Sequence, residues 1–283
     1  MDRARIMGVL NVTPDSFSDG GRHSDTRAAI EHGLAMAADG ADIIDIGAES
    51  TRPGVAAVPA EIQCARAIPV IRALAHAGPR LSIDTRDAAV MEAALDAGAT
   101  IINDVSALGF DPRARAVAAA RGAAVALMHM RGTPETMNSL AVYEDPVRET
   151  LAELTASLNA AIAAGIAAGS IALDPGIGFA KRGEHSIALL RGLAAFIALG
   201  HPILAGVSRK SFIGGLSGED DPARRLPGSL AAGLFALSQG ASILRVHDVR
   251  ETVQAVRVWE SLQFVQRPNA SLKPPPPATY RSP

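Results

Sequence analysis

Amide, guanidinium and imidazole side chains occur in this chain where short apolar runs give way to polar residues. Asn11 follows the first apolar run, Arg52 lies in the polar segment after the second, and Arg245 and His247 end the last. These groups suit phosphate oxygens, contacted directly or through a divalent metal ion. Asn11 offers a neutral oxygen, and Mg²⁺ needs little more from protein when phosphates and water hold it. The sequence therefore predicts a site for a phosphorylated ligand with Mg²⁺.

Three further hydrogen-bond acceptors, Asp84, Asn103 and Asp174, end three other apolar runs. A carboxylate that faces an amidine-like edge forms a bidentate, charge-assisted pair, so these residues suit a flat heterocycle carrying N–H donors. A site in which Asp84 and Asp174 bind only a metal is an alternative, but neither has a His or a second carboxylate at ligand spacing. Together the two groups predict a phosphorylated or diphosphorylated heterocycle as the ligand.

Each of these residues also has an ordinary structural role open to it. Asp84 or Thr85 could cap the helix that follows, and His247 with Asp248 could open the last helix. Asp45 lies within an apolar run and needs a partner if it is buried, but the sequence does not name one. Other such alternatives are Asn11 in a turn, Arg209 and Lys210 as solvated charges, Phe179 in packing and His129 as a polar rim residue. Each structural role is plausible for a single residue, but together these roles explain the pattern poorly. A scaffold needs helix caps, whereas it does not need a cation or a hydrogen-bond acceptor at nearly every strand end.

Eight short apolar runs would position these side chains as β-strands. The runs are Ile6–Leu10, Asp42–Ile46, Arg80–Ile83, Thr100–Asn103, Ala124–Met128, Ser170–Leu173, Ile203–Val207 and Ser242–Val246. Amphipathic segments such as Thr26–Asp39 and Ala88–Ala97 separate them, with apolar residues at helical spacing. Seven of these segments are expected to end at a glycine that closes the helix in the left-handed conformation, namely Gly40, Gly78, Gly98, Gly122, Gly169, Gly200 and Gly240. With Val249–Leu262 as the last helix, the alternation predicts an α/β fold, a single-domain (β/α)₈ (TIM) barrel.

In such a barrel the loops that follow the strands gather at one rim, and function sits there. The rival fold is a doubly wound open sheet, but the glycine-rich phosphate turn that usually follows its first strand is absent here. We assign residues 1–265 to the barrel. Residues 266–283, with four consecutive prolines from Pro274 to Pro277, are expected to form a disordered tail.

Composition excludes several classes of partner and location. A net charge of −2 over 283 residues gives no global field for nucleic acid or an anionic membrane. No apolar run approaches the length of a membrane span, and the apolar stretch before Asn11 is too short for a signal peptide. The single cysteine, Cys64, excludes an intrachain disulfide and fits a reducing compartment. We therefore expect a soluble, cytoplasmic protein with small-molecule substrates.

Eight segments of the chain resemble those of the dihydropteroate synthase family. Two are long and specific: Asn11–Gly21, with the sequence NVTPDSFSDGG, and Asp45–Gly54, with the sequence DIGAESTRPG. The shorter segments are Ser82–Thr85, Ile102–Ser106, Met128–Met130, Asp174–Phe179, Ser208–Phe212 and Arg245–Val249. Because these segments run from the first predicted strand to the last, the resemblance covers the whole predicted barrel.

The resemblance implies a homodimeric enzyme of folate synthesis and a sulfonamide target. It condenses (7,8-dihydropterin-6-yl)methyl diphosphate with 4-aminobenzoate and releases 7,8-dihydropteroate and diphosphate, with Mg²⁺ as cofactor. Asp84, Asn103, Asp174 and Lys210 would bind the pterin; Asn11, Arg52, Arg245 and His247 the diphosphate, with Asn11 as the metal ligand; and Thr51, Pro53, Phe179, Lys210 and Ser211 the aminobenzoate. The catalytic residues would be Asp84, Lys210, Arg245 and His247.

Two other readings remain open beside this one. A pterin-binding domain that transfers a folate methyl group to a corrinoid shares the barrel and the pterin acceptors, but has no use for Ser208–Phe212 and Thr51–Gly54. A non-catalytic paralogue should have lost parts of the two long segments, which this chain retains. The chain also departs from the family pattern at Arg131 and Asn138, which replace common glutamines, and at Ala48 and Arg224. None of these four has an assigned role.

Overall fold

The computed structural model describes residues 3–13, 22–50, 54 and 57–264. Three predicted site residues, Thr51, Arg52 and Pro53, lie outside the described residues, as does most of the long segment after Asn11. The expected tail, residues 266–283, also lies outside them, so the division of the chain near residue 265 stays a prediction.

Eight parallel strands form the centre of the molecule, in the order β6-β5-β4-β3-β2-β1-β8-β7. Their bounds are β1 Arg5–Asn11, β2 Ile43–Gly47, β3 Arg80–Asp84, β4 Ile101–Asp104, β5 Ala124–Met128, β6 Ile171–Asp174, β7 Leu204–Ala205 and β8 Ile243–Val246. A parallel bridge between Leu173 and Ile203 joins the two outer strands of this order, and the Leu173 N–H donates to the Pro202 carbonyl at 2.9 Å. The sheet therefore closes on itself, and the predicted (β/α)₈ barrel is confirmed.

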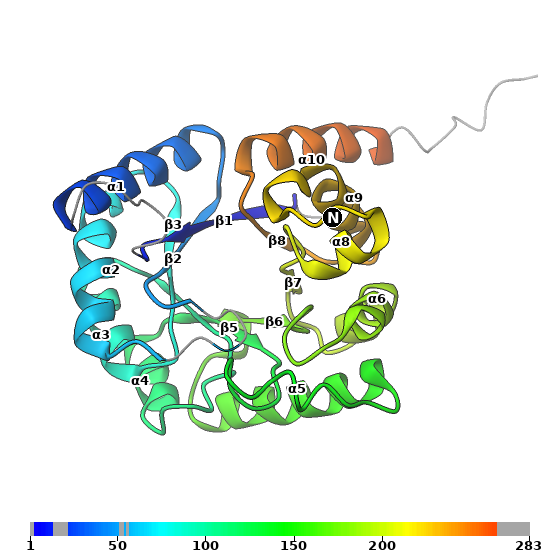
Figure 1. Cartoon of the computed structure of the whole chain (residues 1–283). Helices are drawn as coiled ribbons and strands as arrows, with labels where there is room; N and C mark the ends of the chain where they lie inside the picture. Colours follow the sequence, from blue (N-terminus) through cyan, green and yellow to red (C-terminus); the bar gives the residue numbers. More distant parts are fainter. Residues whose placement is uncertain (1–2, 14–21, 51–53, 55–56, 265–283) are drawn as a thin grey trace, which may run out of the picture.

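Helices surround the strands as an outer ring (Figure 1). Their bounds are α1 Arg22–Ala38, α2 Ala60–Leu74, α3 Ala88–Ala97, α4 Ala114–Arg121, α5 Pro146–Ala163, α6 Gly183–Arg191, α7 Ala194–Ile197, α8 Ser211–Ser217, α9 Leu226–Ser238 and α10 Val249–Phe264. Local sequence explains several of their ends. The Asp87 and Asp145 side chains cap α3 and α5, and Pro146 occupies the first turn of α5, where its missing N–H costs nothing.

Six of the seven glycines predicted to close helices take the left-handed conformation, but Gly78 lies beyond the end of α2 at Leu74, where Ala75 is the C-cap. Gly40, Gly78, Gly98, Gly122, Gly200 and Gly240 all have positive φ. The prediction for Gly169 is wrong, because α5 has already ended at Ala163 and Gly165 takes the left-handed conformation with φ +96°. Gly169 lies in the 3₁₀ turn Ala168–Ser170 that leads into β6. The sequence between Gly165 and β6 is thus a turn and not the last part of the helix.

The inward-facing side chains of the strands change from apolar to polar along the barrel. Met7, Ile43, Ile101 and Leu204 form a small buried cluster inside it, near the amino ends of the strands. A larger apolar core fills the layer between the strands and the helices. Among the described residues, no helix is both long enough and apolar enough to cross a membrane. The lower part of the barrel is therefore packed, and its polar groups gather at the carboxyl ends of the strands.

Strand register aligns four predicted or neighbouring site positions in one row. Asn11 pairs with Gly47, Gly47 with Asp84, and Asp84 with Asn103 across β1, β2, β3 and β4. In a parallel sheet, residues in register point to the same face. Register thus brings Asn11, Asp84 and Asn103 to one side of the sheet although they lie far apart in sequence.

Candidate active site

Arg245 forms the centre of the polar groups inside the barrel. Its Nε donates to Asp45 Oδ2 at 2.7 Å, and its Nη2 donates to Asp84 Oδ2 at 2.7 Å. Asp45 is fully buried and Asp84 nearly so. The guanidinium therefore supplies the partner that buried Asp45 requires, and it connects β8 with β2 and β3.

Asn103 joins the same cluster through its side-chain amide. Asn103 Nδ2 donates to Asp45 Oδ2 at 3.0 Å, so this oxygen accepts from both Asn103 and Arg245. The other oxygen, Asp45 Oδ1, and the buried Ser82 Oγ have no hydrogen-bond partner in the described part of the chain. A buried polar atom without a hydrogen-bond partner costs free energy, unless a bound ligand or water supplies that partner. The cluster thus retains hydrogen-bonding capacity for a ligand.

Asp84 accepts from Arg245 inside the barrel and does not cap a helix. Asp87 caps α3 by accepting from the N–H groups of Ala89 and Val90, so the structural alternative for Asp84 and Thr85 is wrong. Burial raises the pKa of Asp84, whereas the charge of Arg245 lowers it, and the nearby carboxylate of Asp45 raises it again.

Asp174 occupies the carboxyl end of β6, where it is buried. Its Oδ1 accepts from the Gly176 N–H at 2.7 Å. Burial raises the pKa of Asp174, while this hydrogen bond and the charges of Lys210 and Arg245 oppose the rise. The carboxylate therefore lies within electrostatic reach of both cations.

Lys210 lies beside the aromatic ring of Phe179. Lys210 Nζ is 4.0 Å from the ring centroid, a cation–π distance. Gly178 allows this approach, because it has φ +81° and a Cβ there would lie 3.2 Å from Lys210 Cδ. Burial lowers the pKa of Lys210 to about 8; Arg245 lowers it too, and Asp174 and Asp84 raise it. Ser211 follows Lys210 as the exposed first residue of α8.

His247 is fixed by the loop that follows β7. Ser208 Oγ lies 3.0 Å from His247 Nδ1 and accepts from the His247 N–H at 3.2 Å. Next to it, Arg209 makes a two-point pair with Asp248, with Nε–Oδ2 and Nη2–Oδ1 distances of 3.1 and 2.5 Å. Arg209 is therefore not the solvated charge that its sequence context allowed. Burial lowers the pKa of His247 to about 4, and Arg209 and Arg245 contribute to this shift.

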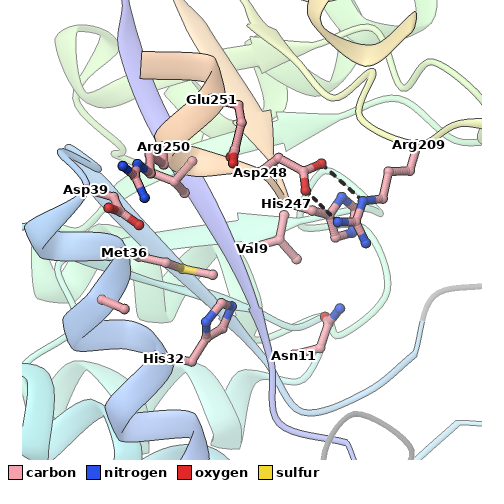
Figure 2. A pocket seen from close by; sticks show the side chains of 12 residues that line it. Val9, Asn11, His32, Met36, Asp39, Arg209, His247, Asp248, Arg250 and Glu251 are labelled. Carbon is pink, nitrogen blue, oxygen red and sulfur yellow. Dashed lines mark hydrogen bonds and ion pairs between the residues drawn. The ribbon is translucent and has the colours of Figure 1, made fainter. Parts of the chain in front are cut away.

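Asn11 and His247 line one cavity of about 410 Å³ between α1 and the start of α10 (Figure 2). His32 and Asp39 line its α1 side, and Glu251 lines its α10 side. The described residues contain no group of three or more His, Cys, Asp or Glu side chains that could hold a metal. The side-chain oxygen of Asn11 is the kind of neutral ligand that suits Mg²⁺ held mainly by phosphate and water oxygens.

No sequence pattern predicted a second polar cluster beside the Phe179 loop, in which His129 and Lys181 are buried. It consists of His129, Glu153, Arg131 and Lys181, joined by hydrogen bonds and ion pairs. His129 follows the last residue of β5 and is 5% exposed, so it is a structural polar residue at the barrel rim, as the sequence predicts, and it is buried within this cluster. The available signals were Lys181, two residues after Phe179, and Arg131, where the family pattern has glutamine. A buried ion pair between Glu49 and Arg86 was also missed.

The fold and the site define a barrel enzyme that binds a small ligand at the carboxyl ends of its strands. Residues 7–247 match the family described as pterin binding enzyme. The chain is 46% identical over 265 residues to the dihydropteroate synthase of Neisseria meningitidis serogroup C, covering 93% of this chain and 94% of the relative.

Two solved structures of Xanthomonas albilineans dihydropteroate synthase are also similar. The complex with 4-aminobenzoic acid has a TM-score of 0.88 and 48% identity, covering 93% of this chain and 94% of that one. The complex with 7,8-dihydropteroate has a TM-score of 0.85 and 45% identity, covering 93% and 95%. The chain belongs to the dihydropteroate synthase family, so the family resemblance in its sequence segments is confirmed.

Proposed function

We propose that this protein condenses (7,8-dihydropterin-6-yl)methyl diphosphate with 4-aminobenzoate to form 7,8-dihydropteroate and diphosphate. The observation that carries the proposal is the convergence of Asp84, Asp174, Lys210 and Arg245 inside one barrel mouth. This set supplies acceptors for a heterocycle next to cations for a leaving anion. Membership in the dihydropteroate synthase family supports the same reaction.

The pterin ring is assigned to the acceptors in the barrel. Asp84 and Asp174 would accept from its N–H groups, and Asn103 would contact it from the neighbouring strand. Lys210 would lie against the same ring and donate to an acceptor on it. Because Arg245 already binds Asp84 Oδ2 and Asp45 Oδ2, the ligand would use the remaining oxygens. The surrounding charges are fixed before the ligand arrives, which limits reorganisation on binding.

The diphosphate group is assigned to Asn11, Arg52, Arg245 and His247. Asn11 and His247 line the same cavity, whereas Arg52 lies outside the described residues. Asn11 would be the protein ligand of Mg²⁺ brought with the diphosphate. When bound, the ion would neutralise charge on the leaving diphosphate. Arg245 and His247 would hold that group and stabilise the charge that develops on it.

The arylamine is assigned to Phe179, Lys210 and Ser211, together with Thr51 and Pro53 from outside the described residues. The Phe179 ring offers an apolar face, and the Lys210 ammonium lies over it. The Ser211 hydroxyl and the start of α8 would favour the carboxylate. Sulfonamides would compete for this pocket.

The proposed reaction breaks the bond between the methylene carbon and the diphosphate oxygen and forms a bond from that carbon to the arylamine nitrogen. The electron pair leaves with diphosphate, and the nitrogen loses one proton to solvent. An arylamine is neutral at pH 7, so the reaction needs no strong general base. The carboxylate of Asp84 would favour positive charge on the pterin while the diphosphate departs.

Assembly and location are further parts of the proposal. We expect a homodimer in the cytoplasm, as the family resemblance implies. Exposed apolar side chains on α10, namely Val258 and Leu262, are compatible with a second copy of the chain covering that helix. Sedimentation of the purified protein at several concentrations would test the dimer.

Release of diphosphate on mixing the components tests the activity and separates it from the two alternatives. The proposed reaction requires the pterin diphosphate, 4-aminobenzoate and Mg²⁺ together. A methyltransferase domain or a non-catalytic pterin-binding protein would release no diphosphate in this mixture, although either would still bind a pterin. Omitting each component in turn provides the controls.

A further inference from the structure

Lys181 is buried beneath the Phe179 loop, and no step of the proposed reaction uses it. Only 8% of the residue is exposed. Its Nζ lies 2.9 Å from the Phe179 carbonyl oxygen, 2.9 Å from His129 Nδ1 and 3.3 Å from the His129 carbonyl oxygen. In its charged form the Lys181 side chain has three hydrogens, and these three acceptors can use all of them. A buried lysine amine with three polar partners has a specific structural role, because a polar group is kept at this depth only where hydrogen bonds satisfy it.

His129 contacts Lys181 through one ring nitrogen and Glu153 through the other. Because Nδ1 accepts from Lys181, the proton of a neutral imidazole resides on Nε2, which lies 2.9 Å from Glu153 Oε2. Burial and the charge of Lys181 together lower the pKa of His129 to about 4, so the neutral ring prevails at pH 7. Glu153 in turn accepts from Arg131 Nε, and the Arg131 guanidinium stacks on Tyr143 at 4.0 Å. One continuous chain of contacts thus leads from Arg131 to the Phe179 carbonyl.

The backbone of the loop makes this anchor necessary. Ala180, between Phe179 and Lys181, has φ +49°, a left-handed conformation that is strained for a residue with a Cβ. Gly176 approaches the His129 carbonyl so closely that a Cβ would lie 2.0 Å from that oxygen. The Phe179 N–H closes the turn by donating to the Gly176 carbonyl at 3.0 Å. A strained turn pressed against His129 persists only where surrounding contacts hold it.

We propose that Lys181 is a positioning residue for the arylamine pocket: by binding the carbonyls of Phe179 and His129, it holds the Phe179 ring over Lys210. Lys181 does not touch the substrates. The inference rests on the proposed function, since it explains how one wall of the proposed aminobenzoate pocket is kept in place. Two of the pterin acceptors, Asp84 and Asn103, lie on β3 and β4 and are fixed independently through Arg245 and Asp45. The third, Asp174, ends β6, accepts from the Gly176 N–H and lies within reach of the charge of Lys181, so it depends on Lys181 in part. Loss of the Lys181 anchor should therefore affect one substrate more than the other.

The test is the Michaelis constant of each substrate in Lys181→Met. We expect the KM for 4-aminobenzoate to rise about tenfold or more, which corresponds to about 1.4 kcal/mol. The KM for the pterin diphosphate should rise less, by about threefold at most, because Asp84 and Asn103 stay in place while Asp174 loses the nearby charge of Lys181; kcat at saturation should stay within a similar range. Arg182→Met is the matched control, because it removes the exposed cation next in sequence and should leave both KM values unchanged. Equal effects on the two substrates, or none on 4-aminobenzoate, would overturn the proposal.

A second variant and a measurement on the unaltered protein keep the proposal testable if Lys181→Met does not fold. Lys181→Gln keeps a polar group but supplies two hydrogens for three acceptors, so it should show the same split between substrates at smaller size. Hydrogen exchange of the unaltered protein should find the Phe179 amide protected, and exchange at the rate of an unstructured peptide would overturn the proposal without any variant. An unaltered protein that makes no dihydropteroate would instead refute the proposed function.

Discussion

Arg245 Nη2 lies 2.7 Å from Asp84 Oδ2, across the barrel from β8 to β3. Sequence patterns alone assign these two residues to different groups, Arg245 to the diphosphate and Asp84 to the heterocycle. In the structure one ion pair joins them, and Asp45 shares the same guanidinium. A ligand that carries both a heterocycle and an anion therefore meets residues that already hold one another in place.

Arg245→Met should destabilise the protein strongly. The change leaves the buried carboxylates of Asp45 and Asp84 without their cation, and breaking such a pair costs about 3–5 kcal/mol of the free energy of unfolding. Urea unfolding measures the loss. Arg209→Met is the control, because the pair between Arg209 and Asp248 is more exposed and should lose less. Equal stability of Arg245→Met and the unaltered protein would contradict the assigned role of the ion pair.

Asn11→Ala should lower turnover without unfolding the protein. Asn11 is only partly buried at the end of β1, and its loss removes the proposed protein ligand of Mg²⁺. We expect kcat to fall about a hundredfold, the scale of one lost group that stabilises charge in the transition state. Asn138→Ala, an exposed amide in another loop, serves as the control. Wild-type turnover in Asn11→Ala would remove Asn11 from the leaving-group site.

Diphosphate binding should be accompanied by proton uptake at His247. Burial and the nearby arginines lower the pKa of this imidazole to about 4, so it is neutral in the free protein at pH 7. An anion beside it favours the charged form and raises that pKa, so binding draws in a fraction of a proton. Calorimetry in buffers of different ionisation enthalpy measures the uptake. His247→Gln should take up less than the unaltered protein, and identical uptake in the two would place the diphosphate elsewhere.

Lys181 should make stability depend on pH in the alkaline range. Burial lowers its folded-state pKa to about 7 from the ordinary 10.5. Between these values the unfolded chain binds a proton that the folded protein lacks, so the free energy of unfolding gains from this residue as the pH rises. Compared with Lys181→Met, the unaltered protein should therefore gain stability from pH 7 to pH 10. A difference between the two proteins that stays constant over this range would contradict the lowered pKa.

Local patterns were sufficient to predict the barrel and the strand ends that carry its chemistry. Asn11, Asp84, Asn103 and Asp174 all occupy the last positions of strands or lie next to them, because apolar runs mark buried strands and polar residues mark where they end. The prediction of glycine at helix ends was correct at most positions for the same reason, since a left-handed helix end depends on a few neighbouring residues. It failed at Gly169 because the chain already offered Gly165 for that purpose.

Pairing between distant residues could not be predicted from local patterns. Asp45 needed a partner, but Arg245 lies 200 positions away and meets it only because the barrel closes. The cluster of His129, Glu153 and Lys181 has the same origin, as its members follow or lie between different strands. Such contacts depend on the stagger of the strands and on side-chain reach, which the spacing of residues along the chain does not contain.

The most direct test of the central claim is the ratio of the two products formed by the purified protein. The protein is mixed with (7,8-dihydropterin-6-yl)methyl diphosphate, 4-aminobenzoate and Mg²⁺, and mass spectrometry quantifies 7,8-dihydropteroate while a coupled assay quantifies diphosphate. The account predicts that the two products appear together in equal amounts and only when both substrates are present. Diphosphate released without dihydropteroate, or neither product under conditions in which the protein is folded, would contradict it.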